Sequence, residues 1–207
     1  KAELDLDKHL DLKNYCDEVG IGFMSSVFSI EDAKLLKQVV TDYVKIPSFE
    51  SRNRELIHYC LKHFEHLIIS TGTSTYDEIR SVVVNLPPER YTLLHCVSSY
   101  PCNFDIVNLP RMEYLKNLSN SIGFSDHSQG IESSVLSLSM GVDFIEKHFT
   151  TNNDLPGRDN KFAVLPSNMK RLSDYIKISK KVMNDKGVDY QDCELDSREN
   201  YTGRFDG

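Results

Sequence analysis

The stretches Ser121-Ile-Gly-Phe-Ser-Asp-His127 and Val142-Asp-Phe-Ile-Glu-Lys-His148, with residues 131–140 between them, decide the fold. Each stretch begins as an apolar, strand-like run and ends in a histidine, and the segment between them has the length of a helix. A strand–helix–strand unit places its strands parallel, so both imidazoles are expected at the same end of a sheet. Two imidazoles at one edge form the first candidate for a functional site.

The same alternation of strand-like and helix-like segments runs along most of the chain. Apolar, β-rich runs start at residues 21, 43, 66, 91, 121 and 142, a spacing of 21 to 30 residues. This rhythm predicts repeated βα units around a parallel sheet. The predicted strands cover residues 21–26, 43–48, 66–71, 91–96, 121–124 and 142–148, and the predicted helices cover residues 7–19, 30–39, 53–64, 76–84, 108–118, 131–140 and 167–183.

The ends of the strands favour a barrel over an open sheet. Nearly every predicted strand ends in a polar cluster, and a (β/α)₈ TIM barrel collects functional groups from many strand ends, whereas an open sheet concentrates them at one switch point. We predict an α/β fold, a (β/α)₈ TIM barrel represented by about six βα units that correspond to strands 3–8. Residues 1–186 form this partial barrel, and the polar, non-periodic residues 187–207 form a linker or disordered tail.

Composition narrows the class of protein. The 207 residues carry a net charge of −7, which argues against a nucleic-acid partner. No apolar run reaches about 18 residues and the first residues lack a signal-peptide core, so no membrane segment or secretion signal is expected. Five irregularly spaced cysteines fit a reduced protein better than a disulfide framework. We expect a cytoplasmic protein that acts on small molecules.

The two histidines have carboxylates nearby that would suit a metal site. Because side chains alternate along a strand, Glu146 shares a face with His148, and Ser125 shares a face with His127. Asp159 follows in a glycine-containing loop that could reach over the mouth of a barrel. Two neutral imidazoles with carboxylates beside them are typical of a divalent-metal site. The alternative is that both histidines only form hydrogen bonds within loops.

A second set of residues predicts an anion-binding site. Lys45 lies in a strand among apolar neighbours, so it either neutralises an acid such as Glu146 or binds an anionic substrate. Hydroxyls that follow neighbouring strands could cradle a phosphate or carboxylate; they belong to Ser48, Ser70 and Thr71, beside Gly72. Ser26 and Tyr100 are further candidates for substrate contact. A Cys–His nucleophile pair at His95-Cys96 is disfavoured, because adjacent residues in a strand face opposite sides.

These motifs together resemble those of the sialic acid synthase family. The matching pieces occur in order over residues 11–185, and they are Lys45-Ile-Pro-Ser48, Ser70-Thr-Gly72, Leu94-His-Cys96, Tyr100-Pro101, Gly123-Phe-Ser-Asp-His127 and Glu146-Lys-His-Phe-Thr150. The resemblance implies a barrel enzyme, a homodimer, that condenses phosphoenolpyruvate with an N-acylated hexose. The acceptor would be N-acetylmannosamine or a 2,4-diacetamido hexose, and the products a nonulosonic acid and phosphate, for surface-polysaccharide biosynthesis.

The resemblance also implies roles for individual residues. The metal, Mn²⁺ with Mg²⁺ or Co²⁺ as alternatives, would be held by His127 and His148. The residues expected to hold phosphoenolpyruvate are Lys45, Ser48, Ser70 and Ser125, together with Ser26. Asp159, Tyr100 and Ser98 would face the sugar, and Glu146 or Asp159 would activate water while Lys45 balances the phosphate charge.

The chain departs from the family pattern in several places. Arg158 stands where the family commonly has proline, and Asn160 where histidine often follows the aspartate, so we expect sugar recognition to differ. The family's first two strands and its small C-terminal antifreeze-protein-like domain have no counterpart in the sequence. Two alternatives stay open: a related 3-deoxy-sugar-acid synthase, and a catalytically silent barrel that serves as a binding or scaffold module.

Overall fold

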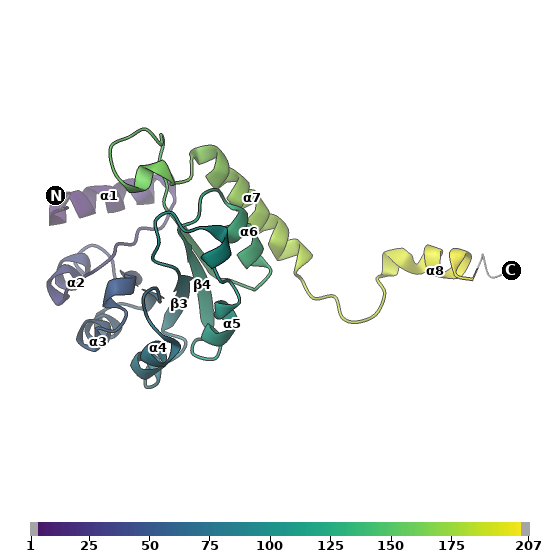
Figure 1. Cartoon of the computed structure of the whole chain (residues 1–207), viewed down its shortest axis with the longest axis horizontal. Coiled ribbons are helices and arrows are strands. Elements are labelled where there is room, and N and C mark those ends of the chain that lie inside the picture. Colours follow the sequence, from purple (N-terminus) through teal and green to yellow (C-terminus); the bar gives the residue numbers. More distant parts are fainter. Residues whose placement is uncertain (1–3, 204–207) are drawn as a thin grey trace.

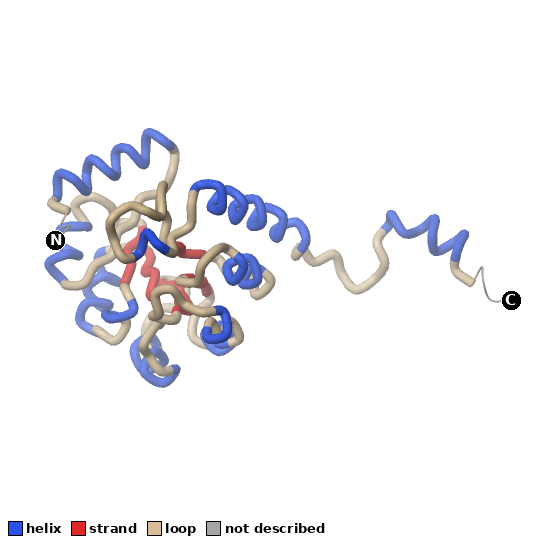
Figure 2. The backbone as a smooth tube through the Cα atoms, turned by 45° about the horizontal axis from the view of Figure 1, so that its top comes forward, coloured by secondary structure: helices blue, strands red, loops and turns tan. Residues whose placement is uncertain are grey.

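The computed structural model describes residues 4–203. At its centre is one sheet of five parallel strands, enclosed by helices (Figure 2). The strands are β1 (Tyr43–Ile46), β2 (His66–Ser70), β3 (Tyr91–Cys96), β4 (Ser121–Asp126) and β5 (Phe144–Lys147). The helices, shown in Figure 1, are α1 (Leu6–Val19), α2 (Ile30–Leu36), α3 (Arg54–His63), α4 (Tyr76–Val83), α5 (Arg111–Leu115), α6 (Glu132–Leu138), α7 (Pro166–Val182) and α8 (Leu195–Tyr201).

The sheet curls into half of a barrel. Its strand order follows the chain without reversal, as in a barrel, whereas a doubly wound sheet reverses at a switch point. The first and last strands also meet across the interior: the rings of Tyr43 and Phe144 lie 6.3 Å apart, and Lys45 Nζ lies 3.3 Å from Glu146 Oε2. In a flat sheet the outer two of five strands would stand roughly 19 Å apart. The predicted barrel-type fold is confirmed.

The predicted strand over residues 21–26 is wrong, so the described residues 4–203 contain five strands and not six. Only Ser26 reaches the sheet, through a single isolated bridge to Lys45. Ile21 and Met24 remain 59 % and 41 % exposed. An apolar run is stabilised as a strand by cross-strand neighbours that cover one of its faces, and this run has none beyond Ser26.

The C-terminal tail contains a helix that the sequence analysis did not predict. Residues 195–201 form α8, which no buried residue anchors and which lies away from the barrel (Figure 1). Gln191 and Glu194 form a capping box just before it, and this local pairing favours a helical turn in an otherwise polar segment. Residues 184–191, between α7 and this short segment, contain no helix or strand, and the division of the chain at residue 187 stays a prediction.

Helix α4 illustrates how the outer layer is built from the sequence. Thr75 caps its N-terminus by accepting a hydrogen bond from the Glu78 amide, and the Glu78 carboxylate accepts one from the Thr75 amide in return. One face of the helix is buried against the sheet through Ile79, Val82 and Val83, and burial of each such side chain contributes about 1.5–3 kcal/mol. No helix within residues 4–203 is long and apolar enough to cross a membrane.

A buried ion pair joins β4 to β5 on the outer face of the sheet. Lys147 Nζ lies 3.2 Å from Asp126 Oδ2, and the two side chains are 2 % and 0 % exposed. Ser128 and Ser134 donate hydrogen bonds to the Asp126 carboxylate, and Lys147 donates one to the Ser128 carbonyl. Burial lowers the pKa of Lys147, and the negative charge of Asp126 opposes that shift without cancelling it. Each partner directly precedes one of the two histidines.

Replacement of Lys147 by Met should lower the free energy of unfolding by about 3–5 kcal/mol, because it leaves the Asp126 charge buried without its counter-ion. Denaturant-induced unfolding measures the change. Lys170→Met is the control, since Lys170 pairs with Asp174 on the exposed face of α7, and we expect its midpoint to stay close to wild type. Equal losses in the two variants would contradict the role given to the buried pair.

Substitution of Gly123 by Ala should destabilise the barrel by about 1–3 kcal/mol, through overpacking. An added Cβ would lie 2.6 Å from the Phe144 carbonyl oxygen and would collide with the Leu94 side chain. Gly22→Ala is a matched control, because a Cβ there meets nothing within 4 Å. The thermal midpoints of both variants test this, and a Gly123→Ala protein as stable as the control would refute it.

Candidate active site

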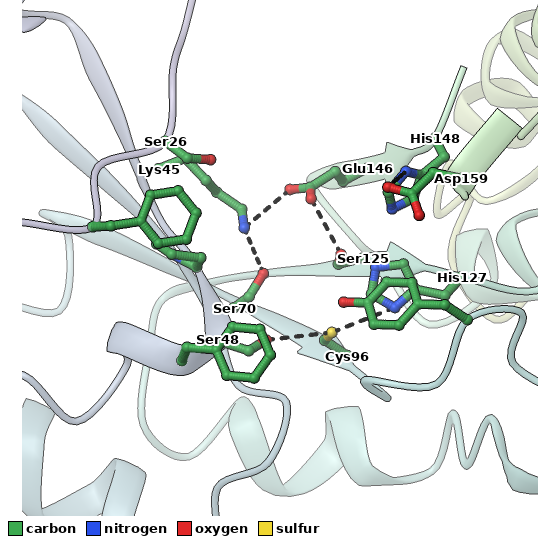
Figure 3. Close-up of a pocket in the computed structure, with 14 residues that line it drawn as sticks. Ser26, Lys45, Ser48, Ser70, Cys96, Ser125, His127, Glu146, His148 and Asp159 are labelled. Carbon is green, nitrogen blue, oxygen red and sulfur yellow. Dashed lines mark hydrogen bonds and ion pairs between the residues drawn. The ribbon is translucent and has the colours of Figure 1, made fainter. Parts of the chain in front are cut away.

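A cavity of about 330 Å³ opens at the carboxyl ends of the strands (Figure 3). All five strands or the residues directly after them contribute side chains to its wall, as expected for the mouth of a barrel. Among the residues predicted from the sequence, this cavity brings together Ser26, Lys45, Ser48, Ser70, Tyr100, Ser125, His127, Glu146, His148 and Asp159. The wall also contains Cys96, Phe28, Pro47 and Phe49, which the sequence analysis did not select.

Two of the predicted substrate-binding residues lie outside this wall. The Thr71 side chain is fully buried, and its hydroxyl donates a hydrogen bond to the Leu94 carbonyl. Ser98 is not among the lining residues, although its hydroxyl lies 4.0 Å from Cys96 Sγ, which does line the wall. The Thr71 hydroxyl therefore joins the end of β2 to β3.

Lys45 is the centre of the polar network on one side of the cavity. Its ammonium donates a 2.7 Å hydrogen bond to Ser70 Oγ and lies 3.3 Å from Glu146 Oε2. Ser125 Oγ donates to the other oxygen of Glu146 at 3.3 Å. The lysine is buried, so the glutamate offsets a charge that would otherwise be costly to desolvate. The pairing predicted with Glu146 is present, and the ammonium still lines the cavity, where an anion can reach it.

Gly72 is required by a close approach between two loops. Its amide donates to Ser48 Oγ at 3.2 Å, and a Cβ at this position would lie 2.7 Å from the same oxygen. The serine hydroxyl in turn points its hydrogen toward Cys96 Sγ, 3.5 Å away. Absence of a side chain at residue 72 thus allows the backbone to fix the Ser48 hydroxyl at the cavity wall.

The two histidines converge on the opposite side of the cavity, as the sequence predicted (Figure 3). Their ring centroids lie 5.3 Å apart, and Tyr100 packs 4.2 Å from the His127 ring. His127 Nδ1 lies 2.9 Å from the Val97 carbonyl oxygen, so this nitrogen donates and Nε2 keeps a free lone pair. His148 Nδ1 lies 3.5 Å from the Asp159 carboxylate.

Burial and hydrogen bonds move the pKa values of these groups in different directions. Burial lowers the pKa of His148, and the nearby Asp159 charge does not restore it, so the neutral imidazole is favoured. For His127, burial also lowers the pKa, but its contacts with Cys96 and the Val97 carbonyl outweigh that effect and raise it. Burial raises the pKa of Cys96, and hydrogen bonds with His127 and Ser48 reverse the shift, so its pKa is lowered.

Cys96 is the functional-site residue that sequence reasoning missed. The analysis paired it with His95, which indeed faces the outer layer, where its Nε2 contacts the Val107 carbonyl and its ring stacks on Phe124. The thiol instead lies 3.8 Å from His127 Nδ1 on the next strand. Strand register could have revealed it, because Cys96 aligns with Ser125, two residues before that histidine.

The donor set fits a divalent ion that takes most of its ligands from small molecules. His127 has one ring nitrogen fixed by a backbone carbonyl and His148 has one beside a carboxylate, the outer contacts that commonly orient metal-binding imidazoles. Within residues 4–203 no three His, Cys, Asp or Glu side chains form a preformed metal-binding group. An ion held here would therefore have open positions for water and substrate oxygens.

The fold and the cavity together define a βα-barrel domain with its reactive groups at the carboxyl ends of the strands. A sequence model of the NeuB family matches residues 1–187, and the chain belongs to the NeuB family. The resemblance inferred from the motifs is thereby confirmed.

Individual relatives agree with this assignment. N,N′-diacetyllegionaminic acid synthase of Campylobacter jejuni is 35 % identical over 191 residues, which cover 89 % of this chain and 57 % of the relative. The enzyme of the same name from Legionella pneumophila is 33 % identical, with 95 % and 57 % covered. The crystal structure of N-acetylneuraminic acid synthetase from Leptospira borgpetersenii matches with a TM-score of 0.89 at 29 % identity, covering 98 % of this chain and 72 % of that one. The chain thus spans little more than half the length of these two curated relatives.

Proposed function

We propose that the whole protein condenses phosphoenolpyruvate with an N-acylated hexose, giving a nonulosonic acid and phosphate. The observation that carries the proposal is the placement of Lys45, held between Ser70 and Glu146, across one cavity from the histidine pair. The names of the relatives, legionaminic and sialic acid synthases, support the same reaction. The acceptor is N-acetylmannosamine, a 2,4-diacetamido hexose or a derivative of one of these sugars.

The anion-binding side of the cavity suits phosphoenolpyruvate. Lys45 supplies the positive charge, and the hydroxyls of Ser48, Ser70 and Ser125 supply hydrogen bonds to phosphate or carboxylate oxygens. When the anion enters, Lys45 gains a second negatively charged partner beside Glu146. Its positive charge is therefore paired both before and after the anion binds. Asp159 and Tyr100, at the other end of the cavity, face the acceptor.

The chemistry forms one carbon–carbon bond and one carbon–oxygen bond, the latter to water, and breaks the carbon–oxygen bond to phosphate. C3 of the enol phosphate attacks the aldehyde carbon of the open-chain sugar, and the aldehyde oxygen takes up a proton. Water then adds to C2 and loses a proton to a carboxylate, Glu146 or Asp159. The tetrahedral centre collapses to a ketone and expels phosphate, whose charge Lys45 balances.

His127 and His148 hold the divalent metal, Mn²⁺ with Mg²⁺ or Co²⁺ as alternatives. When bound, such an ion supplies Lewis-acid polarisation of the aldehyde carbonyl. Neutral His127 carries its proton on Nδ1, beside the Val97 carbonyl, and leaves Nε2 free, while burial favours the neutral form of His148. Both features favour a ligand role over a merely structural one.

The proposal also covers the location of the enzyme, its oligomeric state and its biosynthetic role. The five cysteines Cys16, Cys60, Cys96, Cys102 and Cys193 are all free thiols, which supports a reducing, cytoplasmic location. The family resemblance supports a homodimer and a role in surface-polysaccharide biosynthesis. The related 3-deoxy-sugar-acid synthases remain the second candidate activity, since they share the barrel and the use of phosphoenolpyruvate.

Mutation of Lys45 to Met should lower phosphate release by about 10²–10³-fold, as expected when a preorganised charge partner is removed. The assay supplies the whole protein with phosphoenolpyruvate, Mn²⁺ and either acceptor. Lys37→Met, at an exposed position, is the charge-matched control. Absence of phosphate release from wild type with every N-acylated hexose would instead favour the scaffold alternative.

Addition of Mn²⁺ should raise the thermal midpoint of the whole protein, because binding to the folded state alone stabilises it. The variant His148→Ala should lose this rise, whereas His58→Ala, on the exposed face of α3, should keep it. Differential scanning fluorimetry with and without the ion provides the readout. An undiminished rise in His148→Ala would overturn the ligand assignment.

A further inference from the structure

A second, larger cavity adjoins the active-site cavity. It measures about 890 Å³, and the two share Tyr100 and Asp159 in their walls. Its remaining wall includes Gln129, Arg158 and Lys161, from the loops that follow β4 and β5. A sugar that reacts beside the histidines can therefore extend past Asp159 into this second space, whose size is ordinary for a ligand site.

Two cations without counter-ions line the second cavity. Among residues 4–203, neither the Arg158 nor the Lys161 side chain takes part in an ion pair or side-chain hydrogen bond, although both line the cavity wall. The one carboxylate in the wall, Asp159, lies 3.5 Å from His148 Nδ1, at the junction with the active-site cavity. Positive charge thus predominates at the end remote from the histidines.

The loop that carries these cations is braced internally. Asn153 Nδ2 donates to the carbonyls of Asn160 and Ala163, at 2.6 and 3.0 Å, and Asn160 Nδ2 donates to the Pro156 carbonyl at 3.0 Å. These cross-links fix the backbone of residues 153–163 on either side of Arg158 and Lys161. Of the two departures from the family pattern, Asn160 takes part in this bracing and Arg158 is carried by the braced segment.

We propose that the acceptor carries an acidic group, a phosphate monoester or a carboxylate, at the end remote from its reacting aldehyde, and that Arg158 and Lys161 bind it. A guanidinium binds either group through paired, charge-assisted hydrogen bonds, and a lysine adds a point charge. The proposal rests on the proposed function, which places the aldehyde beside the histidines.

The acceptor can be identified by comparing three sugars in the whole protein with Mn²⁺. They are N-acetylmannosamine, its 6-phosphate, and the corresponding 6-carboxylate, N-acetylmannosaminuronic acid. Consumption of phosphoenolpyruvate gives kcat/KM for each, and calorimetry gives the affinity of each sugar without turnover. We expect at least one acidic sugar to exceed the neutral one about 10-fold in kcat/KM and in affinity. The acidic sugar with the higher values then shows whether the cavity binds a phosphate or a carboxylate.

The double variant Arg158→Gln with Lys161→Gln should reduce that preference for the acidic sugar at least about 10-fold, measured as the ratio of kcat/KM values. Lys180→Gln with Lys181→Gln removes the same charge from α7, outside both cavities, and should keep the ratio. A neutral sugar bound and used as well as both acids, or an unchanged ratio in the double variant, would overturn the proposal. Tight binding of an acidic sugar without any turnover would uphold this site and refute the proposed reaction instead.

Discussion

The buried ion pair between Asp126 and Lys147 is the interaction on which the arrangement of the site depends. Because side chains alternate along a strand, Lys147 can meet Asp126 on the outer face only when Glu146 and His148 face inward. A register shift of one residue between β4 and β5 would turn the lysine into the cavity and leave the aspartate buried without a partner. The pair therefore fixes both the register and the inward direction of Glu146 and His148.

Inside the barrel the same alternation stacks two layers of different chemistry. Tyr43 and Phe144 form an apolar layer at the base, and Lys45 and Glu146, two residues further along the same strands, form a charged layer above it. Lys45 itself is buried above these rings, and lower local polarity strengthens the attraction of a lysine for an anion. The strands thus determine where the Lys45 ammonium lies, and aromatic rings form the layer directly below it.

Much of this organisation could be predicted from particular residues, and the failures have physical reasons. The βα rhythm and strand parity predicted the convergence of Lys45, Glu146 and the histidines, because both depend only on local geometry. Residues 21–26 were wrongly predicted as a strand, since an apolar run does not reveal whether a neighbour covers it. The Cys96–His127 contact and the cations of the loop at 153–163 depend on spatial neighbours that sequence distance conceals.

The close approach at Gly72 has a consequence for how such a domain can change over time. Any larger residue there displaces the Ser48 hydroxyl, so position 72 itself tolerates little variation. The asparagine-braced loop is different, because Arg158 and Lys161 project from it without supporting its hydrogen bonds. Substitutions at these two loop positions can therefore change the charge of the second cavity while the Gly72–Ser48 contact is left intact.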